Sequence, residues 1–362
     1  RAVDIRYSDW QCLLEPGDNG AAARLVTPDG ACVGTGIFDR RDPVAAWRRF
    51  SRAEDAVFDE RYVVDAAREA AERRAEEACR CLAASDADFL PGLFVRQLGD
   101  VLLVSAETAA ADAHAGVAAE VFADVAADAP RETVFVNDGP ARAAFGLECG
   151  RWTRSGGGLK GFWVTLDGVA LRADPLRPEQ PPVDLAQREQ HVLAGSLCDG
   201  RRVLDCFAGN GAFALHALRG GATAATAVEP RETFAKAAGA HAERNGVSVA
   251  VRAATPAAFL AEAAGGAFDA ILLDMPEATE TASGEQMLRD AFRILPGGGL
   301  LACYARRPAA VADAPEAAVG RAAFAAGREA RIFARTVPPF DFPVRLNFPE
   351  SAFLRGLLVE VE

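Results

Sequence analysis

The stretch from residue 202 to residue 230 constrains the fold most, because its pattern predicts a strand, a glycine turn, a helix and a second strand that ends in an acid. A short apolar strand ends at Asp205, and Gly209 and Gly211 allow a tight turn into an alanine-rich helix over residues 212–218. Glycine adopts dihedral angles that a Cβ forbids and lets the backbone approach a ligand closely. Glu229, at the end of the second strand, is placed to accept hydrogen bonds from ribose hydroxyls. Such a unit is typical of a site for a nucleotide-like cofactor.

Two kinds of cofactor compete for this unit. The spacing Gly209-x-Gly211-x-x-Ala214 fits the dinucleotide motif, in which a helix N-terminus faces a pyrophosphate. Here, however, Asp205-x-Phe207 precedes the first glycine and places a carboxylate at the strand tip, where it repels pyrophosphate and suits a cationic methionine group. The sequence therefore favours S-adenosylmethionine over a nicotinamide or flavin dinucleotide, or over a Rossmann-like layer that binds nothing. The predicted cofactor contacts are Asp205, Phe207, Gly209, Gly211 and Glu229.

The last part of the chain alternates strands with helices. Its predicted strands cover residues 203–205, 224–229, 248–253, 270–274 and 300–304. This alternation predicts a mostly parallel sheet covered on both faces, which is an α/β fold of the Rossmann-like type. Ligands of such sheets bind beyond the carboxyl ends of the strands, where Asp205, Glu229 and Asp274 all fall.

Three domains are expected from changes in pattern along the chain. Residues 1–56 alternate short β-like runs with turns and predict a small β-rich module. Residues 57–172 predict a middle α/β domain that opens with an alanine-, glutamate- and arginine-rich helix over residues 59–84. The proline-rich residues 175–182 form the expected linker, and residues 173–362 hold the Rossmann-like domain.

Charge and composition limit the classes of partner. The formal net charge of −12 is unusual for a nucleic-acid binder, because lysine and arginine usually neutralise phosphates there. Residues 39–52 nevertheless gather the arginines that are expected to contact RNA, namely Arg40, Arg41, Arg48, Arg49 and Arg52. The alternative is an amphipathic segment that packs Trp47 and Phe50 inward and leaves the arginines in solvent.

Neither a membrane nor a metal is expected as a partner. No apolar run approaches the roughly 18 residues that a membrane span needs. The eight cysteines form no CxxC pair and have no histidines near them at ligand spacing, which argues against zinc and against a disulfide scaffold. The sequence begins with Arg1 instead of Met, and a transit peptide removed upstream would explain this. A mitochondrial matrix or plastid stroma is therefore favoured over a bacterial-type cytoplasm.

At this point the chain resembles large-subunit ribosomal RNA cytosine-5 methyltransferases with an N-terminal PUA domain. The likeness runs over nearly the whole length, and the order and spacing of its motifs together are specific. The motifs are Gly34-x-Gly36, Leu90-Pro91-Gly92-Leu93, Gln187-Arg188, Asp205-x-Phe207-x-Gly209-x-Gly211, Asn245-Gly246, Phe268-Asp269, Asp274, Pro296-Gly297-Gly298, Asp341-x-Pro343-Val344, Pro349-Glu350 and Phe353-Leu354-Arg355-Gly356.

The resemblance implies a reaction that needs a cysteine. In that family a thiolate adds to C6 of cytosine, C5 then takes the methyl group from S-adenosylmethionine, and a base removes the C5 proton. The family's cysteine lies in a Ser-Cys-Ser triplet after the Pro-Gly-Gly turn, and counting without gaps places Ala305 at that position. Cys303 lies two residues earlier, on the same side of the strand but about 6 to 7 Å deeper. Cys303 is the nucleophile if a local register slip brings it to the position of the family's cysteine. Otherwise it is a buried small apolar residue.

Other family positions also differ. The family's Asp-Pro-Pro, whose aspartate helps to hold the target base, is Asp274-Met275-Pro276 here, and the segment that follows it is shorter. Its Lys-Thr-Gly stretch is Gln180-Pro181-Pro182, and residues 253–258 lack the aspartate expected near the adenine. All four losses concern the site, which indicates relaxed selection on catalysis.

The preferred hypothesis is a protein related to these methyltransferases that is impaired in cytosine-5 methylation. It would bind ribosomal RNA and ribosomal proteins and act as a structural or assembly subunit, with S-adenosylmethionine still bound or lost. The alternative is an active rRNA cytosine-5 methyltransferase with Cys303 as nucleophile and Asp274 positioning the base. A third hypothesis keeps the cofactor and changes the acceptor to one that needs no covalent step.

Overall fold

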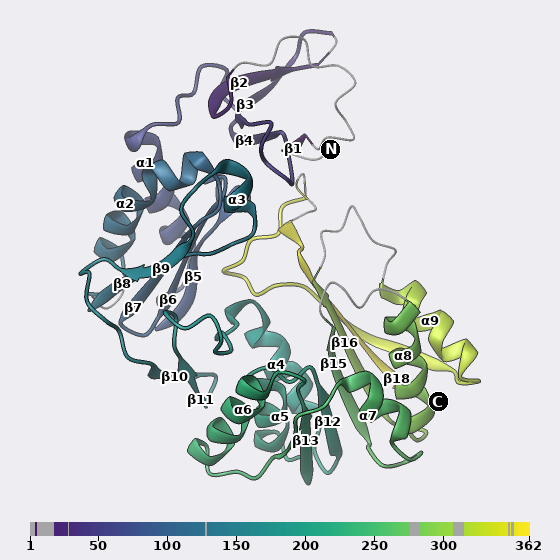
Figure 1. Cartoon of the computed structure of the whole chain (residues 1–362). Helices are drawn as coiled ribbons and strands as arrows, with labels where there is room; N and C mark the ends of the chain where they lie inside the picture. The colour runs from purple at the N-terminus through teal and green to yellow at the C-terminus, as the bar shows by residue number, and fades with distance from the viewer. Residues whose placement is uncertain are drawn as a thin grey trace. The chain divides into compact units, whose positions relative to one another are not determined.

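The chain folds into two compact units. The computed structural model describes residues 4–5, 18–27, 29–126, 129–275, 282–306, 315–346, 348 and 351–362. The first unit comprises Arg1–Lys160, Pro175–Arg177 and Phe340–Ser351, and the second comprises Gly161–Asp174, Pro178–Pro339 and Ala352–Glu362. Figure 1 labels the elements of both units. The division into three domains stays a prediction: the first unit takes in residues 1–160, and Gly161–Asp174, at the end of the expected middle domain, belong to the second unit.

The first unit begins with an antiparallel sheet in the order β1-β4-β3-β2. Its strands are β1 (Asp4–Ile5), β2 (Ala21–Val26), β3 (Cys32–Phe38) and β4 (Trp47–Ser51). Gly34 and Gly36 let β3 approach β4 closely: a Cβ would lie 2.3 Å from the Ser51 carbonyl oxygen at Gly34 and 2.4 Å from the Trp47 ring at Gly36. The β-rich N-terminal region predicted from the sequence is therefore present.

A second sheet of the first unit has the order β5-β6-β7-β8-β9, and only its β7 and β8 strands pair in parallel. The strands are β5 (Cys79–Ala84), β6 (Leu93–Leu98), β7 (Val101–Ala106), β8 (Glu132–Asn137) and β9 (Gly150–Thr153). The helices are α1 (Glu60–Glu72), α2 (Ala109–Asp124) and α3 (Ala141–Phe145). Side chains of α1 and α2, such as Val63 and Phe122, share one core with Leu82 and Leu102 of the sheet.

The predicted helix over residues 59–84 is wrong in its second half. Helix α1 starts at the Asp59 cap, whose side chain accepts a hydrogen bond from the Tyr62 amide, and it ends at Glu72. Residues Cys79–Ala84 form β5 instead, with five of the six side chains buried and a ladder to β6. Burial and strand pairing at long range override the local helix propensity of alanine and arginine.

The second unit is built on one seven-stranded sheet with the order β14-β13-β12-β15-β16-β18-β17. Strands β12 to β16 run parallel, and β18 pairs antiparallel with both β16 and β17. The strands are β12 (Arg202–Cys206), β13 (Ala224–Val228), β14 (Ala250–Arg252), β15 (Ala270–Met275), β16 (Leu300–Arg306), β17 (Ala330–Thr336) and β18 (Leu354–Val361). A hairpin of β10 (Phe162–Leu166) and β11 (Val169–Ala173) precedes the sheet. The fold class predicted from the sequence, a mostly parallel Rossmann-like sheet, is confirmed.

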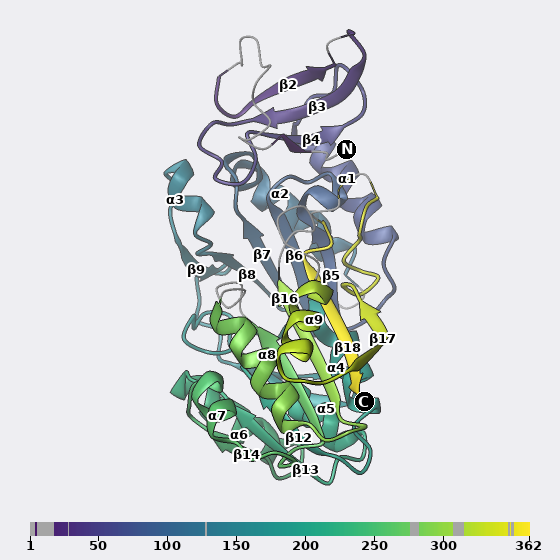
Figure 2. The ribbon, with the colours of Figure 1, turned by 90° about the vertical axis from the view of Figure 1, so that its right-hand side faces the viewer.

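Helices cover both faces of this sheet. They are α4 (Arg188–Ser196), α5 (Ala212–Arg219), α6 (Glu232–Arg244), α7 (Pro256–Glu262), α8 (Ala282–Ile294) and α9 (Pro315–Ala325). Successive strand residues point to opposite faces: Leu204 packs in a core with Phe292 of α8, and Val203 packs in a second core with Phe213 of α5. Figure 2 shows α8 and α9 in front of β16 and β18. Ligands of such sheets bind beyond the carboxyl ends of the parallel strands.

No membrane-spanning helix is present among the described residues, since none of the helices there combines the necessary length with sufficient apolar character.

Candidate functional site

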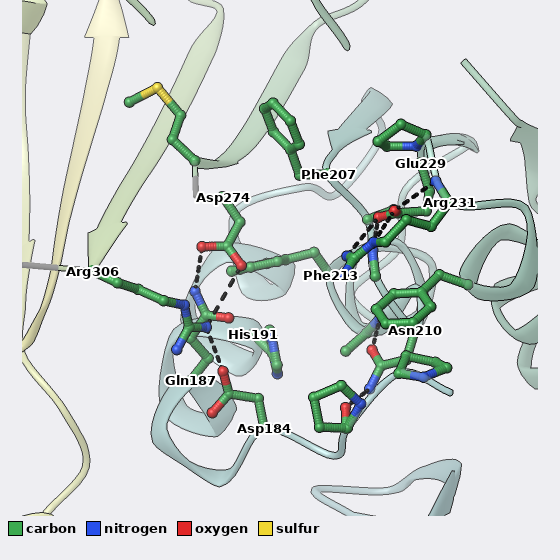
Figure 3. Close-up of a pocket in the computed structure, with 18 residues that line it drawn as sticks. Asp184, Gln187, His191, Phe207, Asn210, Phe213, Glu229, Arg231, Asp274 and Arg306 are labelled. Carbon is green, nitrogen blue, oxygen red and sulfur yellow. Dashed lines mark hydrogen bonds and ion pairs between the residues drawn. The ribbon is translucent and has the colours of Figure 1, made fainter. Parts of the chain in front are cut away.

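A cavity of about 680 Å³ lies within the second unit, beyond the carboxyl ends of β12, β13, β15 and β16 (Figure 3). Its walls come from the segment before α4, the glycine loop after β12, and the ends of three further strands. The lining residues are Pro181, Pro182, Asp184, Gln187, His191, Phe207, Ala208, Gly209, Asn210, Ala212, Phe213, Glu229, Pro230, Arg231, Phe234, Asp274, Met275 and Arg306. Of the predicted cofactor contacts, Phe207, Gly209 and Glu229 line the cavity, and Asp205 and Gly211 do not.

The glycine loop takes the left-handed backbone that the sequence predicts. Phe207, Gly209 and Gly211 have φ values of 59°, 56° and 81°. A Cβ at Gly211 would lie 3.1 Å from the Cβ of Ala238, so this glycine is needed for the packing of α6. At Gly209 the closest atom to an added Cβ is 3.9 Å away, so its side-chain direction is open. The loop thus presents an unobstructed backbone to the cavity.

Asp205 is sealed beneath this loop, where the sequence predicted a carboxylate that faces the ligand. Its side chain is fully buried, and its Oδ2 accepts a hydrogen bond of 3.0 Å from the Ala214 amide in the first turn of α5. Oδ1 has no hydrogen-bond partner among the described residues. Burial raises the pKa of Asp205 to about 8, against the opposing effect of the Ala214 amide. Asp205 therefore holds the loop and helix together and is not exposed to a ligand.

Glu229, directly after β13, lines the cavity, although its side chain is fully buried like that of Asp205. Its Oε2 accepts a hydrogen bond of 2.9 Å from the Gly209 amide. Its Oε1 accepts hydrogen bonds from the Arg231 amide at 3.0 Å and from Arg231 Nε at 2.7 Å. The Arg231 guanidinium also lies 3.5 Å from the centre of the Phe234 ring. The carboxylate thus orders the glycine loop and is bound on its other side by Arg231.

A cluster of four polar side chains forms the opposite wall around Asp274. Gln187 Nε2 donates a hydrogen bond of 2.8 Å to Asp274 Oδ1, and an Arg306 guanidinium nitrogen lies 3.7 Å from Asp274 Oδ2. Arg306 also forms an ion pair with Asp184. Burial raises the pKa of Asp274 to about 6, although Arg306 and the hydrogen bond from Gln187 act in the other direction. Asp274 is thus available as a proton acceptor near neutral pH.

The structure places Cys303 in the sheet core and away from the cavity walls. Cys303 pairs with Leu273, Ala305 pairs with Met275, and the ladder between them has no register shift. Its side chain is 2% exposed and belongs to the core that includes Leu273 and Leu357. Cysteine is absent from the lining residues of the described chain, and Ala305 is at the position where the resemblance requires a thiol. Pro276, the last residue of the family's Asp-Pro-Pro position, lies outside the described residues, as do Pro349 and Glu350.

Sequence reasoning missed Arg231 and the pair of Asp184 and Arg306. Arg306 lies 122 positions after Asp184 in the chain, and only the sheet brings the two together. The signal that could have found Arg306 is its place directly after Ala305, where the family triplet has its second serine.

Two of the five arginines predicted to contact RNA are bound by groups of the first unit, and their side chains are mostly or fully buried. Arg48 forms ion pairs with Asp42 at 2.6 Å and with Asp86 at 2.8 Å. Arg49 is 7% exposed and donates a hydrogen bond of 3.3 Å to the Val33 carbonyl oxygen. An RNA contact stays a prediction at these two positions, where groups inside the first unit bind both guanidinium groups.

The other three arginines, Arg40, Arg41 and Arg52, are exposed. Arg41 forms an ion pair of 2.8 Å with Asp39 and lies 5.7 Å from the centre of the Phe145 ring. An RNA contact at these three positions stays a prediction. The described part of the chain holds no group of three or more His, Cys, Asp or Glu side chains arranged to bind a metal ion.

The core of the second unit matches a known family model. Residues 203–299 match the sequence model of the methyltransferase domain family Methyltransf_25. This segment contains the glycine loop, Glu229 and Asp274. The match agrees with the prediction of a methyltransferase fold with S-adenosylmethionine as its cofactor.

Several bacterial relatives carry one name, ribosomal RNA large subunit methyltransferase I. The protein from Tolumonas auensis is 29% identical over 213 residues, and that from Aeromonas hydrophila is 31% identical over 207 residues; each alignment covers 53% of this chain. The protein from Pseudoalteromonas atlantica is 26% identical over 294 residues, or 77% of this chain. The alignments span about half of the first two relatives, 52% in each, and 74% of the third.

Solved structures match the fold over the whole chain. One described as "A putative sam-dependent methyltransferase from Streptococcus mutans" has a TM-score of 0.81 at 16% identity and covers 99% of this chain and 95% of its own. Another, a methyltransferase structure complexed with SAH, has a TM-score of 0.80 with the same identity and coverage. At this identity the likeness shows the fold alone.

Proposed function

We propose that this protein binds S-adenosylmethionine in the cavity of the second unit. The donor and acceptor groups suit that molecule: the Glu229 carboxylate is placed for ribose hydroxyls, and the open backbone at Gly209 leaves room beside it. Phe207, Pro230 and Phe234 provide apolar surface for a purine. When bound, this cofactor supplies an electrophilic methyl group. The match of residues 203–299 to the methyltransferase domain family supports the assignment.

The macromolecular partner in this proposal is ribosomal RNA. The relatives are named as methyltransferases of large-subunit ribosomal RNA, and the exposed Arg40, Arg41 and Arg52 offer phosphate contacts. The net charge of −12 limits how much affinity phosphate contacts can supply. Ribosomal protein neighbours would therefore hold part of the complex.

The proposal also holds that the covalent cytosine-5 reaction is impaired, and one observation carries this. The residue at the nucleophile position, Ala305, cannot add to a base, and the nearby thiol of Cys303 is 2% exposed in a core beneath it. Without a covalent adduct at C6, C5 of cytosine is a poor nucleophile. In addition, Arg306 lies against Asp274, the aspartate that the resemblance assigns to base positioning. A structural or assembly role in the ribosome follows from this loss.

An active methyltransferase is the second candidate, and the open cavity favours it. The same wall offers Asp274, whose pKa of about 6 suits a general base for an acceptor that needs no covalent step. Cofactor binding alone therefore does not distinguish a structural subunit from an enzyme with a changed acceptor.

The test combines a titration with a product assay. Labelled S-adenosylmethionine is titrated against the purified chain, and methyl transfer to large-subunit rRNA is then measured for the wild type and for Cys303→Ala. The proposal expects cofactor binding and no transfer to cytosine C5. Failure to bind at millimolar cofactor would contradict the cofactor assignment. Methyl transfer that is unchanged in Cys303→Ala would establish the second candidate, an enzyme with a changed acceptor. Transfer that occurs in the wild type and is lost in Cys303→Ala would show that the protein is a cytosine-5 methyltransferase with Cys303 as its nucleophile.

A further inference from the structure

The sealed position of Asp205 leaves the cationic end of the proposed cofactor without its expected partner. The methionine end of S-adenosylmethionine is a zwitterion, with an ammonium and a carboxylate on one carbon. Three carboxylates line the cavity among the described residues: Asp184, Glu229 and Asp274. Glu229 is at the ribose end, and Asp274 is bound by Gln187. Asp184 forms an ion pair with Arg306, so this pair offers the two opposite charges that a zwitterion needs.

Asp184 is held in a fixed position at the cavity wall. It caps the short helical turn Leu185–Gln187, because its Oδ1 accepts a hydrogen bond of 2.9 Å from the Ala186 amide. Its Oδ2 is bound by the guanidinium of Arg306, which extends from the end of β16. The side chains of Asp184 and Arg306 are 27% and 31% exposed, so both remain accessible from the cavity.

The distribution of charges along the cavity matches the two ends of the cofactor. Figure 3 shows Asp184 and Arg306 on one side of the cavity and Glu229 and Arg231 on the other, with Phe213 between them. A nucleoside whose ribose contacts Glu229 therefore directs its other end toward the pair. A carboxylate has about four lone-pair directions and a guanidinium five N–H donors, so each member of the pair can bind a ligand group without releasing the other.

We propose that Asp184 and Arg306 bind the amino-acid end of S-adenosylmethionine, with the Asp184 carboxylate accepting from the ammonium and the Arg306 guanidinium donating to the carboxylate. The inference rests on the proposed cofactor function and adds two binding residues to it. On the ligand, the ammonium and the carboxylate are attached to the same carbon. On the protein, the Asp184 carboxylate and the Arg306 guanidinium are neighbours, so each charged group of the ligand meets a group of opposite charge. Charge-assisted hydrogen bonds of this kind are stronger than neutral ones and fix orientation. The pair would thereby also set the direction of the methyl group toward Asp274.

The test compares ligands with and without the amino-acid end. S-adenosylmethionine, S-adenosylhomocysteine and 5′-methylthioadenosine, which lacks that end, are titrated by calorimetry into the wild type, Asp184→Asn and Arg306→Gln. Binding of the first two ligands is expected to weaken roughly 10- to 100-fold, since each variant removes one charged hydrogen bond, and 5′-methylthioadenosine should bind as in the wild type. Asp184→Asn preserves the shape of the side chain and serves if Arg306→Gln does not fold.

Two control variants are titrated with the same three ligands. Glu229→Gln should weaken all three ligands, because it acts on the ribose that they share. Arg335→Gln removes an arginine of β17 that pairs with Glu316 and does not line the cavity, and it should change none of them.

The remaining outcomes overturn the inference in distinguishable ways. An equal loss for all three ligands in Asp184→Asn would mean that the pair only shapes the cavity. Unchanged binding of all three ligands would mean that the pair does not contact the cofactor, while the cofactor assignment itself stands. A wild type that binds none of the three would overturn the cofactor assignment together with the inference.

Discussion

At the scale of single residues, Arg231 binds the Glu229 carboxylate that is proposed to contact the ribose. Its Nε donates to Glu229 Oε1 over 2.7 Å, and its side chain is 58% exposed whereas that of Glu229 is fully buried. We expect Arg231→Ala to tighten binding of S-adenosylmethionine by about two- to fivefold, because the Arg231 guanidinium no longer competes with the ribose for the buried Glu229 carboxylate. Calorimetric titration of the wild type and of Arg231→Ala measures the two affinities.

The control for Arg231 is Lys236→Ala, which removes an ion pair with Glu232 that is exposed on both sides and does not line the cavity, so the affinity should stay unchanged. Weaker binding in Arg231→Ala would contradict the competition and would show that Arg231 itself holds the cofactor against Phe234.

Asp205 makes a prediction about stability against pH. Its pKa is raised by burial to about 8 in the folded chain and lies near 3.8 when exposed, so the folded state favours the protonated form. Its contribution is complete below about pH 4 and is lost as the pH rises through about 8. Relative to Asp205→Asn, the wild type should lose up to about 1.4 kcal/mol of unfolding free energy per pH unit over this range. Urea unfolding of both proteins at pH 5, 6, 7 and 8 measures this difference in unfolding free energy.

The comparison for Asp205 is Asp269→Asn. Its hydrogen bonds with Arg202 lower the pKa of Asp269 to about 2, so both states are ionised between pH 5 and pH 8 and the difference from the wild type should be flat. A flat difference for Asp205→Asn as well would contradict the burial of its carboxyl group.

The residues that act through local pattern were predictable from the sequence. Glu229 and the glycine loop follow from their positions after consecutive strands, and both line the cavity. Asp184 and Arg306 do not follow from local pattern, since their contact depends on the register of β16 in the sheet. Asp205 was assigned to the ligand because spacing gives the end of a strand but does not give the depth of a side chain beneath a loop.

At the scale of elements, the glycine loop between β12 and α5 offers a test with a matched control. Gly209 and Gly246 have similar left-handed backbones, with φ values of 56° and 68°, and neither has an atom that would clash with a Cβ. Alanine at either position should cost about 1–2 kcal/mol of stability through backbone strain. Only Gly209 lines the cavity, so only Gly209→Ala should also weaken binding of S-adenosylmethionine.

Thermal unfolding measures the stability of both glycine variants, and titration measures their affinity for S-adenosylmethionine. Equal loss of affinity in Gly246→Ala would mean that strain anywhere in the unit reduces binding, and unchanged affinity in Gly209→Ala would remove the loop from the cofactor site.

Most elements of the second unit were predictable, because its strands alternate with helices and each strand is a short apolar run. The error at β5 has a physical cause. Residues Cys79–Ala84 have the composition of a helix, and only their pairing with β6 and their burial make them a strand. Pairing partners distant in the chain leave no local signal.

At the scale of the whole molecule, the segment Phe340–Ser351 belongs to the first unit although it follows strands of the second. Arg74, after α1, donates a hydrogen bond of 3.0 Å to the Asp341 carbonyl oxygen, which is a contact across 267 positions. The sequence predicted boundaries from composition, and composition does not reveal a chain that returns to an earlier unit.

Salt dependence tests the proposed RNA partner at the same scale. Removing the exposed arginines in Arg40→Ala with Arg52→Ala should weaken binding to large-subunit rRNA and reduce the slope of log affinity against log salt by roughly 0.7–0.9 per lost phosphate contact. Filter binding from 50 to 200 mM salt measures both. Arg321→Ala, an exposed arginine of α9 paired with Glu285, is the control, and a reduction of slope in that variant alone would contradict the interface.

The central claim is that the cavity holds a methyl donor beside a site without a nucleophilic thiol. Its most direct test is the amount of labelled 5-methylcytosine formed in large-subunit rRNA by the wild type and by Cys303→Ala under identical conditions. We predict none above background for either protein, since Ala305 occupies the position of the nucleophile and Cys303 lies in the core. Labelled 5-methylcytosine that forms with the wild type and disappears in Cys303→Ala would contradict the claim.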